Sequence, residues 1–544
     1  MRKYHGKGVC NTIAIGEAFV LKKQDTRIDS PVYSANSDIE LKRFKKAKTL
    51  ALKQTKALYD KAIQMNNKIS ADIFESHYMM LQDNGFNNCI KNYIKDESLN
   101  AEHAVFKALN LFSDRFKNLD DPYMRARHFD IKDICERLIA CLQEKYISYS
   151  KLKYDCIVCA NDITPGELIN FDHSKLLGFA FSCGSVHSHT AILAKSLNIA
   201  LSIHLGDGFL ASVKNGDIIA INGYTGEVFV NPDDKTLKEL NRIKTEEVLW
   251  HAKLDKLKGK TSKTLDGKKI RICANIATPN EIPAVINSDA DGIGLVRSEF
   301  LYLGRDNFPT EDEQFLSYKT ILEGMGSKNV IIRTLDIGSD KKVDYFNIPK
   351  EKNPAMGLRA IRICLKKPDI LITQLRALYR ASVYGNLSIM FPMITSVDET
   401  LSLIDICNKV KQALLSENIP FSNNVKIGLT IETPAAAIIS DQLAKIVDFF
   451  SLGTNDLIQY TLACDRENSE VDKFLDKYHD AVFKLIEITA KNAQDSSIPV
   501  GICGDLAADT SVTEKLLKMG IDNLSVPASD VLNLRKTVRS IRLN

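Results

Sequence analysis

Residues 292–297, Gly292-Ile293-Gly294-Leu295-Val296-Arg297, form a short apolar run that ends in an arginine. Such a run is typical of a buried strand in a parallel sheet. Eight runs of this kind, with helical segments between them, follow one another from residue 262 onward: 270–276, 292–296, 330–333, 387–391, 427–431, 449–452, 500–502 and 524–526. Eight successive β/α units predict a TIM barrel over residues 262–544.

Polar side chains stand where several of these predicted strands end. They are Arg297, Arg333, Glu432, the pair Asn455 and Asp456, and Cys503. The active sites of TIM barrels lie at the carboxyl ends of the strands. The agreement between strand count and polar placement therefore predicts an active site at that end.

The first half of the chain shows two other sequence patterns. Residues 32–146 repeat apolar side chains every three to four positions, which predicts a small helical bundle. Residues 1–31 and 147–231 carry short apolar runs with Gly and Asp turns, including a hairpin turn at 222–227. We expect a β/α domain into which the bundle is inserted, followed by a linker helix over 232–261. The expected class is therefore multidomain α/β.

Composition narrows the function classes. The 544 residues favour three to four domains, and 72 Lys and Arg against 68 Asp and Glu leave a net charge of only +4. That balance argues against a dedicated nucleic-acid binder. No apolar run reaches eighteen residues and no signal peptide is expected, so membrane insertion is not predicted. The twelve dispersed cysteines, among them Cys156 and Cys159 in an apolar run, suggest reduced thiols in the cytoplasm.

Residues 184–195 place two histidines, His187 and His189, between a predicted strand and a helix. The positive end of a helix suits a phosphoryl group, and a neutral imidazole is a nucleophile. We expect the flanking hydroxyls of Ser188 and Thr190 to fix the tautomer. The alternative is a histidine that caps the helix and has no chemical role.

The barrel motifs suit an anionic substrate and a metal. Guanidinium groups such as those of Arg297 and Arg333 hold phosphate through two hydrogen bonds, and residues 353–362 supply a further arginine. Glu432 and Asp456 offer hard oxygen ligands for Mg²⁺. They could instead act as general acid and base, as in glycosidases. We expect the arginines to keep both carboxylates ionised, which favours the metal.

These motifs together resemble enzyme I of the bacterial phosphoenolpyruvate:sugar phosphotransferase system, in order and from about residue 5 to residue 542. The resemblance implies that His189 is the phosphorylated histidine, on a swivelling domain. It implies that Asn455 and Arg466 bind phosphoenolpyruvate. It also makes Cys503, expected to be accessible between two glycines, the proton donor to the enolate carbon of pyruvate.

The resemblance also implies partners. The small carrier protein HPr would receive the phosphoryl group and dock on the helical bundle around residues 73–83, and a homodimer would form through the barrel. Asn66, Asn67 and Lys68 make that platform less acidic than is usual. Other departures from the family pattern are Ser185, Lys195 and Asp505, where the family has Gly, Arg and usually Glu.

Two other functions compete with this interpretation. Pyruvate phosphate dikinase and phosphoenolpyruvate synthase share the histidine and barrel motifs, but the residues before His189 are too few and too helical for their ATP-binding domain. A regulatory paralogue without turnover is disfavoured by the intact set of motif residues. The chain ends at residues 541–544, soon after the eighth strand, so we expect a shortened last barrel helix that leaves apolar surface exposed.

Overall fold

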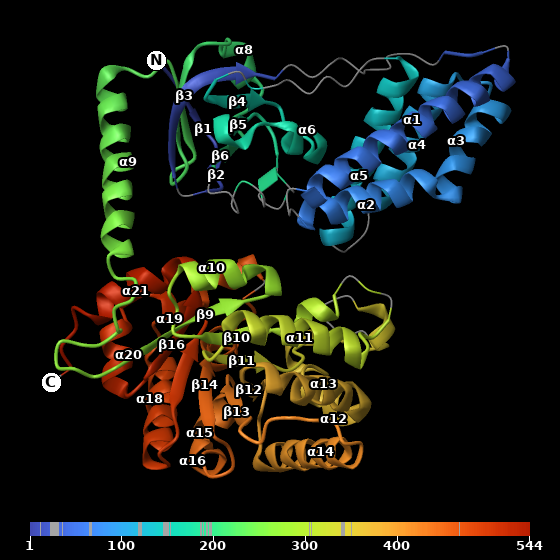
Figure 1. The fold of residues 1–544 in the computed structure, drawn as a ribbon. Helices are drawn as coiled ribbons and strands as arrows, with labels where there is room; N and C mark the ends of the chain where they lie inside the picture. Colours follow the sequence, from blue (N-terminus) through green and yellow to red (C-terminus); the bar gives the residue numbers. More distant parts are fainter. Residues whose placement is uncertain are drawn as a thin grey trace. The chain divides into compact units, whose positions relative to one another are not determined.

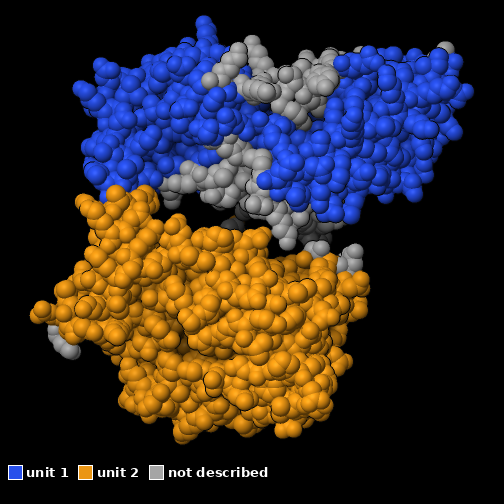
Figure 2. Space-filling view, in the orientation of Figure 1, with its two compact units in different colours: residues 1–249 blue, residues 250–544 orange. Residues whose placement is uncertain are grey.

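The structure, a computed structural model, describes the chain except residues 11, 22–31, 35, 65–67, 118–121, 145–151, 153, 185–187, 189, 192–193, 195–198, 304, 306, 339–342, 350, 467 and 544. Two compact units make up the chain, residues 1–249 and residues 250–544 (Figure 2). Within the described residues, no helix has both the length and the apolar character needed to cross a membrane.

The first unit contains an eight-stranded sheet in the order β1-β8-β7-β3-β4-β5-β6-β2 (Figure 1). The strands are β1 (Arg2–His5), β2 (Lys7–Gly8), β3 (Ile13–Val20), β4 (Cys156–Ala160), β5 (Leu176–Phe181), β6 (Ala200–Ile203), β7 (Ile218–Asn222) and β8 (Glu227–Val230). The strands β3 to β6 are parallel neighbours, and β7 and β8 form the predicted antiparallel hairpin. Cys156 and Cys159 are buried free thiols in β4, as predicted.

Gly6 lies between the two strands that occupy opposite edges of this sheet. Its amide donates to the Gly226 carbonyl at 3.1 Å. Gly226 has a φ of +77°, and a Cβ there would collide with the Gly6 carbonyl oxygen. The close backbone contact explains why glycine is needed at this point of the hairpin.

Five helices stand between β3 and β4 in the chain, so the bundle is inserted into the sheet domain (Figure 1). They are α1 (Ser37–Gln64), α2 (Lys68–Gln82), α3 (Asn84–Asp96), α4 (Ala101–Lys117) and α5 (Pro122–Leu142). Phe44, Ala47 and Ala51 form the buried stripe of α1, as their spacing predicts. Arg43 pairs with Glu40 and Glu102, which ties α1 to α4.

After β8 the chain continues as a mostly exposed helix, α9 (Asp234–Asp255), in the predicted linker. The boundary between the two units falls inside this helix.

The second unit is the predicted eight-stranded barrel, closed in the order β10-β11-β12-β13-β14-β15-β16-β9 (Figure 1). The strands are β9 (Arg271–Ile276), β10 (Ile293–Arg297), β11 (Asn329–Arg333), β12 (Asn386–Phe391), β13 (Lys426–Ile431), β14 (Phe449–Gly453), β15 (Val500–Cys503) and β16 (Asn523–Pro527). All neighbouring pairs are parallel, which confirms the TIM-barrel prediction.

Helices separate the barrel strands along the chain. They are α10 (Ile282–Asn287), α11 (Glu311–Met325), α12 (Ile361–Lys366), α13 (Pro368–Ala381), α14 (Val397–Ser416), α15 (Pro434–Ile438), α16 (Ser440–Leu443), α17 (Thr454–Leu462), α18 (Asp480–Asp495), α19 (Asp505–Ala508), α20 (Thr513–Met519) and α21 (Val531–Val538). The expectation of exposed apolar surface after the eighth strand is wrong for the described residues. In α21, Val531, Leu534 and Val538 are buried, and the buried Arg535 pairs with Asp289.

Candidate functional site

Two of the predicted arginines are neighbours on the barrel. Arg297 ends β10, Arg333 ends β11, and the two are register partners in the parallel ladder. Arg297 is exposed, whereas the Arg333 side chain is only 12% exposed. The pair therefore presents one solvated and one buried guanidinium at the carboxyl end of the barrel.

The buried guanidinium of Arg333 is held by two carboxylates. Its Nη2 lies 3.0 Å from Glu299 Oε1, and its Nη1 lies 3.0 Å from Asp336 Oδ2. Burial alone would lower the pKa of Arg333, but nearby carboxylates, with Glu299 and Asp336 foremost, raise it overall. Its Nε is buried and makes no hydrogen bond within the described structure. One donor thus stays free for a ligand oxygen.

A second buried arginine, Arg359, continues this arrangement. Its Nε and Nη2 bind the two oxygens of Asp336 at 2.8 and 3.0 Å. Its Nη1 lies 3.2 Å from both the Tyr460 hydroxyl and Asp456 Oδ1. The result is a continuous series of alternating charges, called the charge chain below. It runs through Glu299, Arg333, Asp336, Arg359 and Asp456.

Sequence reasoning gave Glu299 and Asp336 no role and treated the arginine of the 353–362 motif as secondary. The partners of Arg359 are 23 and 97 positions away, so no local spacing could reveal them. The available signal was an acid shortly after each strand-end arginine, in Arg297-Ser298-Glu299 and Arg333-Thr334-Leu335-Asp336.

The predicted residues of α17 join the same charge chain. Asp456 is buried, and its Oδ2 lies 3.4 Å from Arg466 Nη1. The amide of its neighbour Asn455 bonds Asp505 twice: Nδ2 donates to Oδ1 at 3.3 Å, and Oδ1 accepts from the backbone N–H at 3.0 Å. Asp505, where the family usually has Glu, therefore fixes the orientation of Asn455.

Glu432 lies directly after β13 and is 1% exposed. Its Oε1 accepts the Met393 N–H at 2.6 Å. Burial, together with the charges of Asp456 and Asp336, raises the pKa of Glu432 to about 8 despite Arg333. The expectation that arginines keep this carboxyl ionised is thus wrong for the protein without a bound cation, because burial and like charges outweigh Arg333.

The charge balance of this cluster fits a divalent cation. Four buried carboxylates, those of Glu299, Asp336, Glu432 and Asp456, face two buried arginines, which leaves two negative charges when all are ionised. The buried Asp456 Oδ1 forms an ion pair with Arg359 Nη1 but makes no hydrogen bond within the described structure. No three described His, Cys, Asp or Glu side chains converge as a complete ligand set. Glu432 and Asp456 would therefore hold Mg²⁺ together with substrate oxygens and water.

Cys503 ends β15, opposite Gly453 of β14 in the ladder. It is 6% exposed, so the expectation of an accessible thiol is wrong; Cys183 is the exposed cysteine among the described residues. Its Sγ donates to the Leu452 carbonyl at 3.4 Å, and the Ser451 hydroxyl lies 3.8 Å from the sulfur. Burial raises the pKa of Cys503 to about 11, so the thiol stays protonated at neutral pH.

His189 and His187 lie outside the described residues. The helical backbone begins at Thr190, after β5 and Gly184, in agreement with a strand-to-helix junction. Thr190 donates its hydroxyl proton to the Ile163 carbonyl at 3.2 Å, and its oxygen keeps lone pairs that can accept an imidazole N–H. The expectation that Ser188 and Thr190 fix the tautomer concerns histidines outside the described residues and stays a prediction. Ser188 Oγ accepts the Ala191 N–H at 3.2 Å and caps the helix.

Family comparisons agree with this geometry. The PEP-binding domain of PEP-utilising enzymes matches residues 251–543, their N-terminal domain residues 5–127 and their mobile domain residues 152–226. The phosphoenolpyruvate-protein phosphotransferases of Bacillus sp. (strain S) and Geobacillus stearothermophilus are each 39% identical over 99% of this chain and 93% of their own length. The chain belongs to the phosphoenolpyruvate-protein phosphotransferase family.

The predicted family and enzyme class are thereby confirmed. The phosphotransferase of Bacillus subtilis (strain 168) is 37% identical over 99% of this chain and 95% of its own length. Among solved structures, an NMR structure of Enzyme I (nEIt) is similar over 45% of this chain and 99% of its own, at 32% identity and a TM-score of 0.40.

The paired hydrogen bonds of Arg359 suggest a test of the charge chain in this phosphotransferase. Arg359→Lys keeps the charge but cannot bind both oxygens of Asp336 while reaching Asp456. A loss of about 2 kcal/mol in charge-assisted hydrogen bonding corresponds to a roughly 30-fold lower kcat/KM for phosphoenolpyruvate. The matched control is Arg362→Lys, since the partners of Arg362 among the described residues are the Met356 and Gly357 carbonyls. Equal effects of the two substitutions on kcat/KM in steady-state assays would contradict the proposed importance of the charge chain for activity.

The pKa of Glu432 predicts how metal binding depends on pH. Below pH 8 the metal-free carboxyl carries a proton that a bound cation must displace. Mg²⁺ affinity should therefore fall about tenfold per pH unit below 8, with release of one proton. Calorimetric titrations at pH 6.5 and 7.5, in buffers of different ionisation enthalpy, measure both quantities. An affinity that does not change with pH would show that Glu432 is not a ligand, and Glu432→Gln supplies the control.

Proposed function

We propose that this enzyme transfers the phosphoryl group of phosphoenolpyruvate to His189 and then to the carrier HPr, as the first step of phosphotransferase-system sugar uptake. The observation that carries the proposal is the joining of Arg333, Glu432, Asp456 and Cys503 at one end of the barrel. A buried guanidinium, two buried carboxylates and a protonated thiol together match a phosphorylated enol substrate.

Phosphoenolpyruvate is proposed to bind with its phosphate against Arg297 and Arg333. The charge chain limits the motion of Arg333, and its free Nε is a preorganised donor for a phosphate oxygen. Asn455 and Arg466 supply further donors from α17 and the segment after it. Because these donors are already in place, little reorganisation is needed when charge develops during transfer.

Mg²⁺ is the proposed cofactor, held by Glu432 and Asp456. When bound, it neutralises charge on the substrate's oxygens and supports their orientation. The side chains of this enzyme define where it sits: the Met393 N–H fixes Glu432, and Arg359 and Arg466 fix Asp456.

In the proposed reaction, the bond between phosphorus and the enol oxygen breaks as a nitrogen of His189 forms a bond to phosphorus. The leaving enolate then takes a proton at its methylene carbon from the Cys503 thiol, which gives pyruvate, and the thiolate regains a proton from water. The raised pKa of Cys503 suits this role, because a neutral thiol is the required form. His189 and the barrel belong to different units, so the units must meet for transfer and separate afterwards.

HPr is proposed to dock on the inserted bundle of residues 32–146. On α2 and just after it, Glu75, Met79 and Asp83 are exposed, which offers an apolar centre with acidic flanks to a basic partner. A homodimer through the barrel and a cytoplasmic location are proposed from the family alone. Close to full-length similarity to named phosphotransferases favours this function over a dikinase or synthase.

Labelled phosphoenolpyruvate with Mg²⁺ tests the main step. The enzyme should take up a label that is stable to base and labile to acid, and should pass it to added HPr. His189→Ala should take up no label yet bind phosphoenolpyruvate with unchanged affinity in calorimetry, because the substrate site lies in the other unit. Labelling of the variant, or failure of the wild type to label, would refute the proposal and would leave the regulatory role.

Cys503→Ser separates phosphoryl transfer from protonation of carbon. A hydroxyl is a much weaker acid than a thiol, so pyruvate formation should slow by at least about tenfold. A single phosphorylation of His189 should keep its rate, since it precedes the proton transfer. Rapid-quench sampling of phosphoenzyme beside pyruvate measures both. Cys407→Ser, at a buried thiol on α14, is the control for packing effects. No slowing of either step would show that the proton comes from another group.

A further inference from the structure

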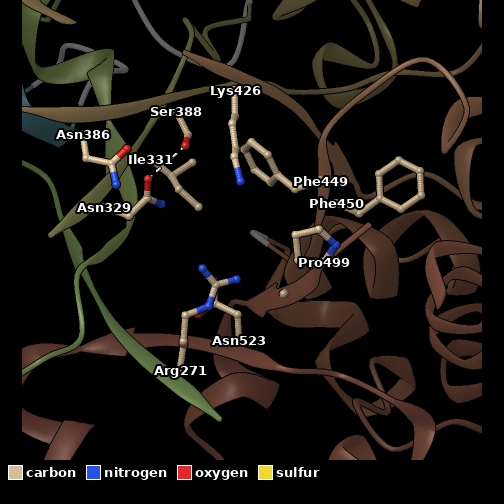
Figure 3. Close-up of a pocket in the computed structure, with 11 residues that line it drawn as sticks. Arg271, Asn329, Ile331, Asn386, Ser388, Lys426, Phe449, Phe450, Pro499 and Asn523 are labelled. Carbon is tan, nitrogen blue, oxygen red and sulfur yellow. Dashed lines mark hydrogen bonds between the residues drawn. The ribbon is translucent and has the colours of Figure 1, made fainter. Parts of the chain in front are cut away.

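A polar cavity of about 120 Å³ lies where the barrel strands begin (Figure 3). Its wall includes the first residues of six strands: Arg271, Asn329, Asn386, Lys426, Phe449 and Asn523. No acidic side chain of the described residues belongs to the wall.

This cavity is separate from the catalytic end of the barrel. The strand β11 runs from Asn329 to Arg333, and β13 begins at Lys426, six residues before Glu432. At about 3.3 Å per residue, the two ends are roughly 13 to 20 Å apart. Between them, Ile331 and Phe449 pack in an apolar cluster with Cys503 and two further side chains. An occupant of the cavity would therefore not touch phosphoenolpyruvate.

Two cationic side chains enter the cavity from opposite walls. The guanidinium of Arg271 and the ammonium of Lys426 both point into it (Figure 3). Both residues are exposed, and neither forms an ion pair with a carboxylate of the described residues. Asp522 is close enough for the charge of Arg271 to lower its pKa, but burial raises that pKa more, and its carboxylate is not part of the wall.

Neutral polar groups complete the wall. The Ser388 hydroxyl donates to Asn329 Oδ1 at 3.0 Å, so the amide nitrogen of Asn329 remains as a donor (Figure 3). Asn523 is 8% exposed, and its Oδ1, a hydrogen-bond acceptor, is buried without a partner in the described structure. An acceptor in this position is satisfied by a water molecule or a protonated group and not by the oxygen of an anion.

We propose that this cavity binds a small dianion, of the class of inorganic phosphate or a short dicarboxylate. Two unpaired cations from opposite walls can each neutralise one negative charge, and the arginine can bind two oxygens of one group. The amide nitrogen of Asn329 can donate an uncharged hydrogen bond to a remaining oxygen. The site stands apart from the proposed transfer reaction and does not depend on it.

Calorimetric titration of the full-length protein with inorganic phosphate and, separately, with succinate tests this site. All titrations use protein that also carries Arg297→Gln, which weakens anion binding at the catalytic end. The double substitution Arg271→Gln with Lys426→Gln should weaken binding at least about tenfold. Its charge-matched control is Lys484→Gln with Lys491→Gln, at two exposed lysines of α18, and should change nothing.

Each outcome decides the matter. Binding of phosphate alone or of succinate alone, lost in the cavity variant, identifies the dianion and supports the site. No binding of either anion, or equal binding by the cavity variant and its control, overturns it. If the double variant does not fold, Lys426→Glu places opposite charges across the cavity, and anion binding retained by that variant would also overturn the site. With Arg297 intact, the cavity variant should keep its full rate of phosphorylation.

Discussion

Asp336 is 2% exposed and lies between Arg333 and Arg359, bound to both. Removing one partner from a buried ion pair leaves an uncompensated charge, which is far more costly than the pair itself is stabilising. Asp336 therefore constrains both guanidiniums at once. Through Arg359 the constraint reaches Asp456 on α17, and through Arg333 it reaches Glu299 after β10. Side chains from distant parts of the chain are thereby held in one connected cluster, to which the proposed function assigns an anionic substrate and a cation.

The same packing explains the protonation states of Glu432 and Cys503. Glu432 is the most buried of the acids in this cluster, and within the described part of the chain its hydrogen-bond partner is a backbone N–H; burial raises its pKa to about 8. Cys503, buried between β14 and β16, keeps its proton for the same main reason: burial raises its pKa, and its thiol faces a carbonyl oxygen. Burial thus raises the pKa of both groups, and the proposed function gives their protons different destinations: solvent for Glu432 and carbon for Cys503.

The sequence predicts whatever depends on local pattern. Strand runs and the polar residues that end them are neighbours in the chain, so the barrel and the positions of Arg297, Arg333, Glu432 and Cys503 could be predicted. Pairing over long separations could not, which is why Arg359 and Asp336 were not assigned as partners. The burial of Cys503 and the pKa of Glu432 depend on packing by several strands. The cavity at the other end was also missed, because asparagines and lysines that begin strands look like ordinary turn residues.

The central claim is that the barrel end holds phosphoenolpyruvate by its phosphate, with its methylene carbon toward the thiol. A crystal structure of the full-length His189→Ala variant with phosphoenolpyruvate and Mg²⁺ tests it most directly, since the substrate cannot be consumed. The account predicts phosphate oxygens on Arg297 and Arg333, a cation on Glu432 and Asp456, and the methylene carbon facing Cys503 Sγ. A substrate whose phosphate avoids both arginines, or whose methylene carbon faces away from Cys503, would contradict it.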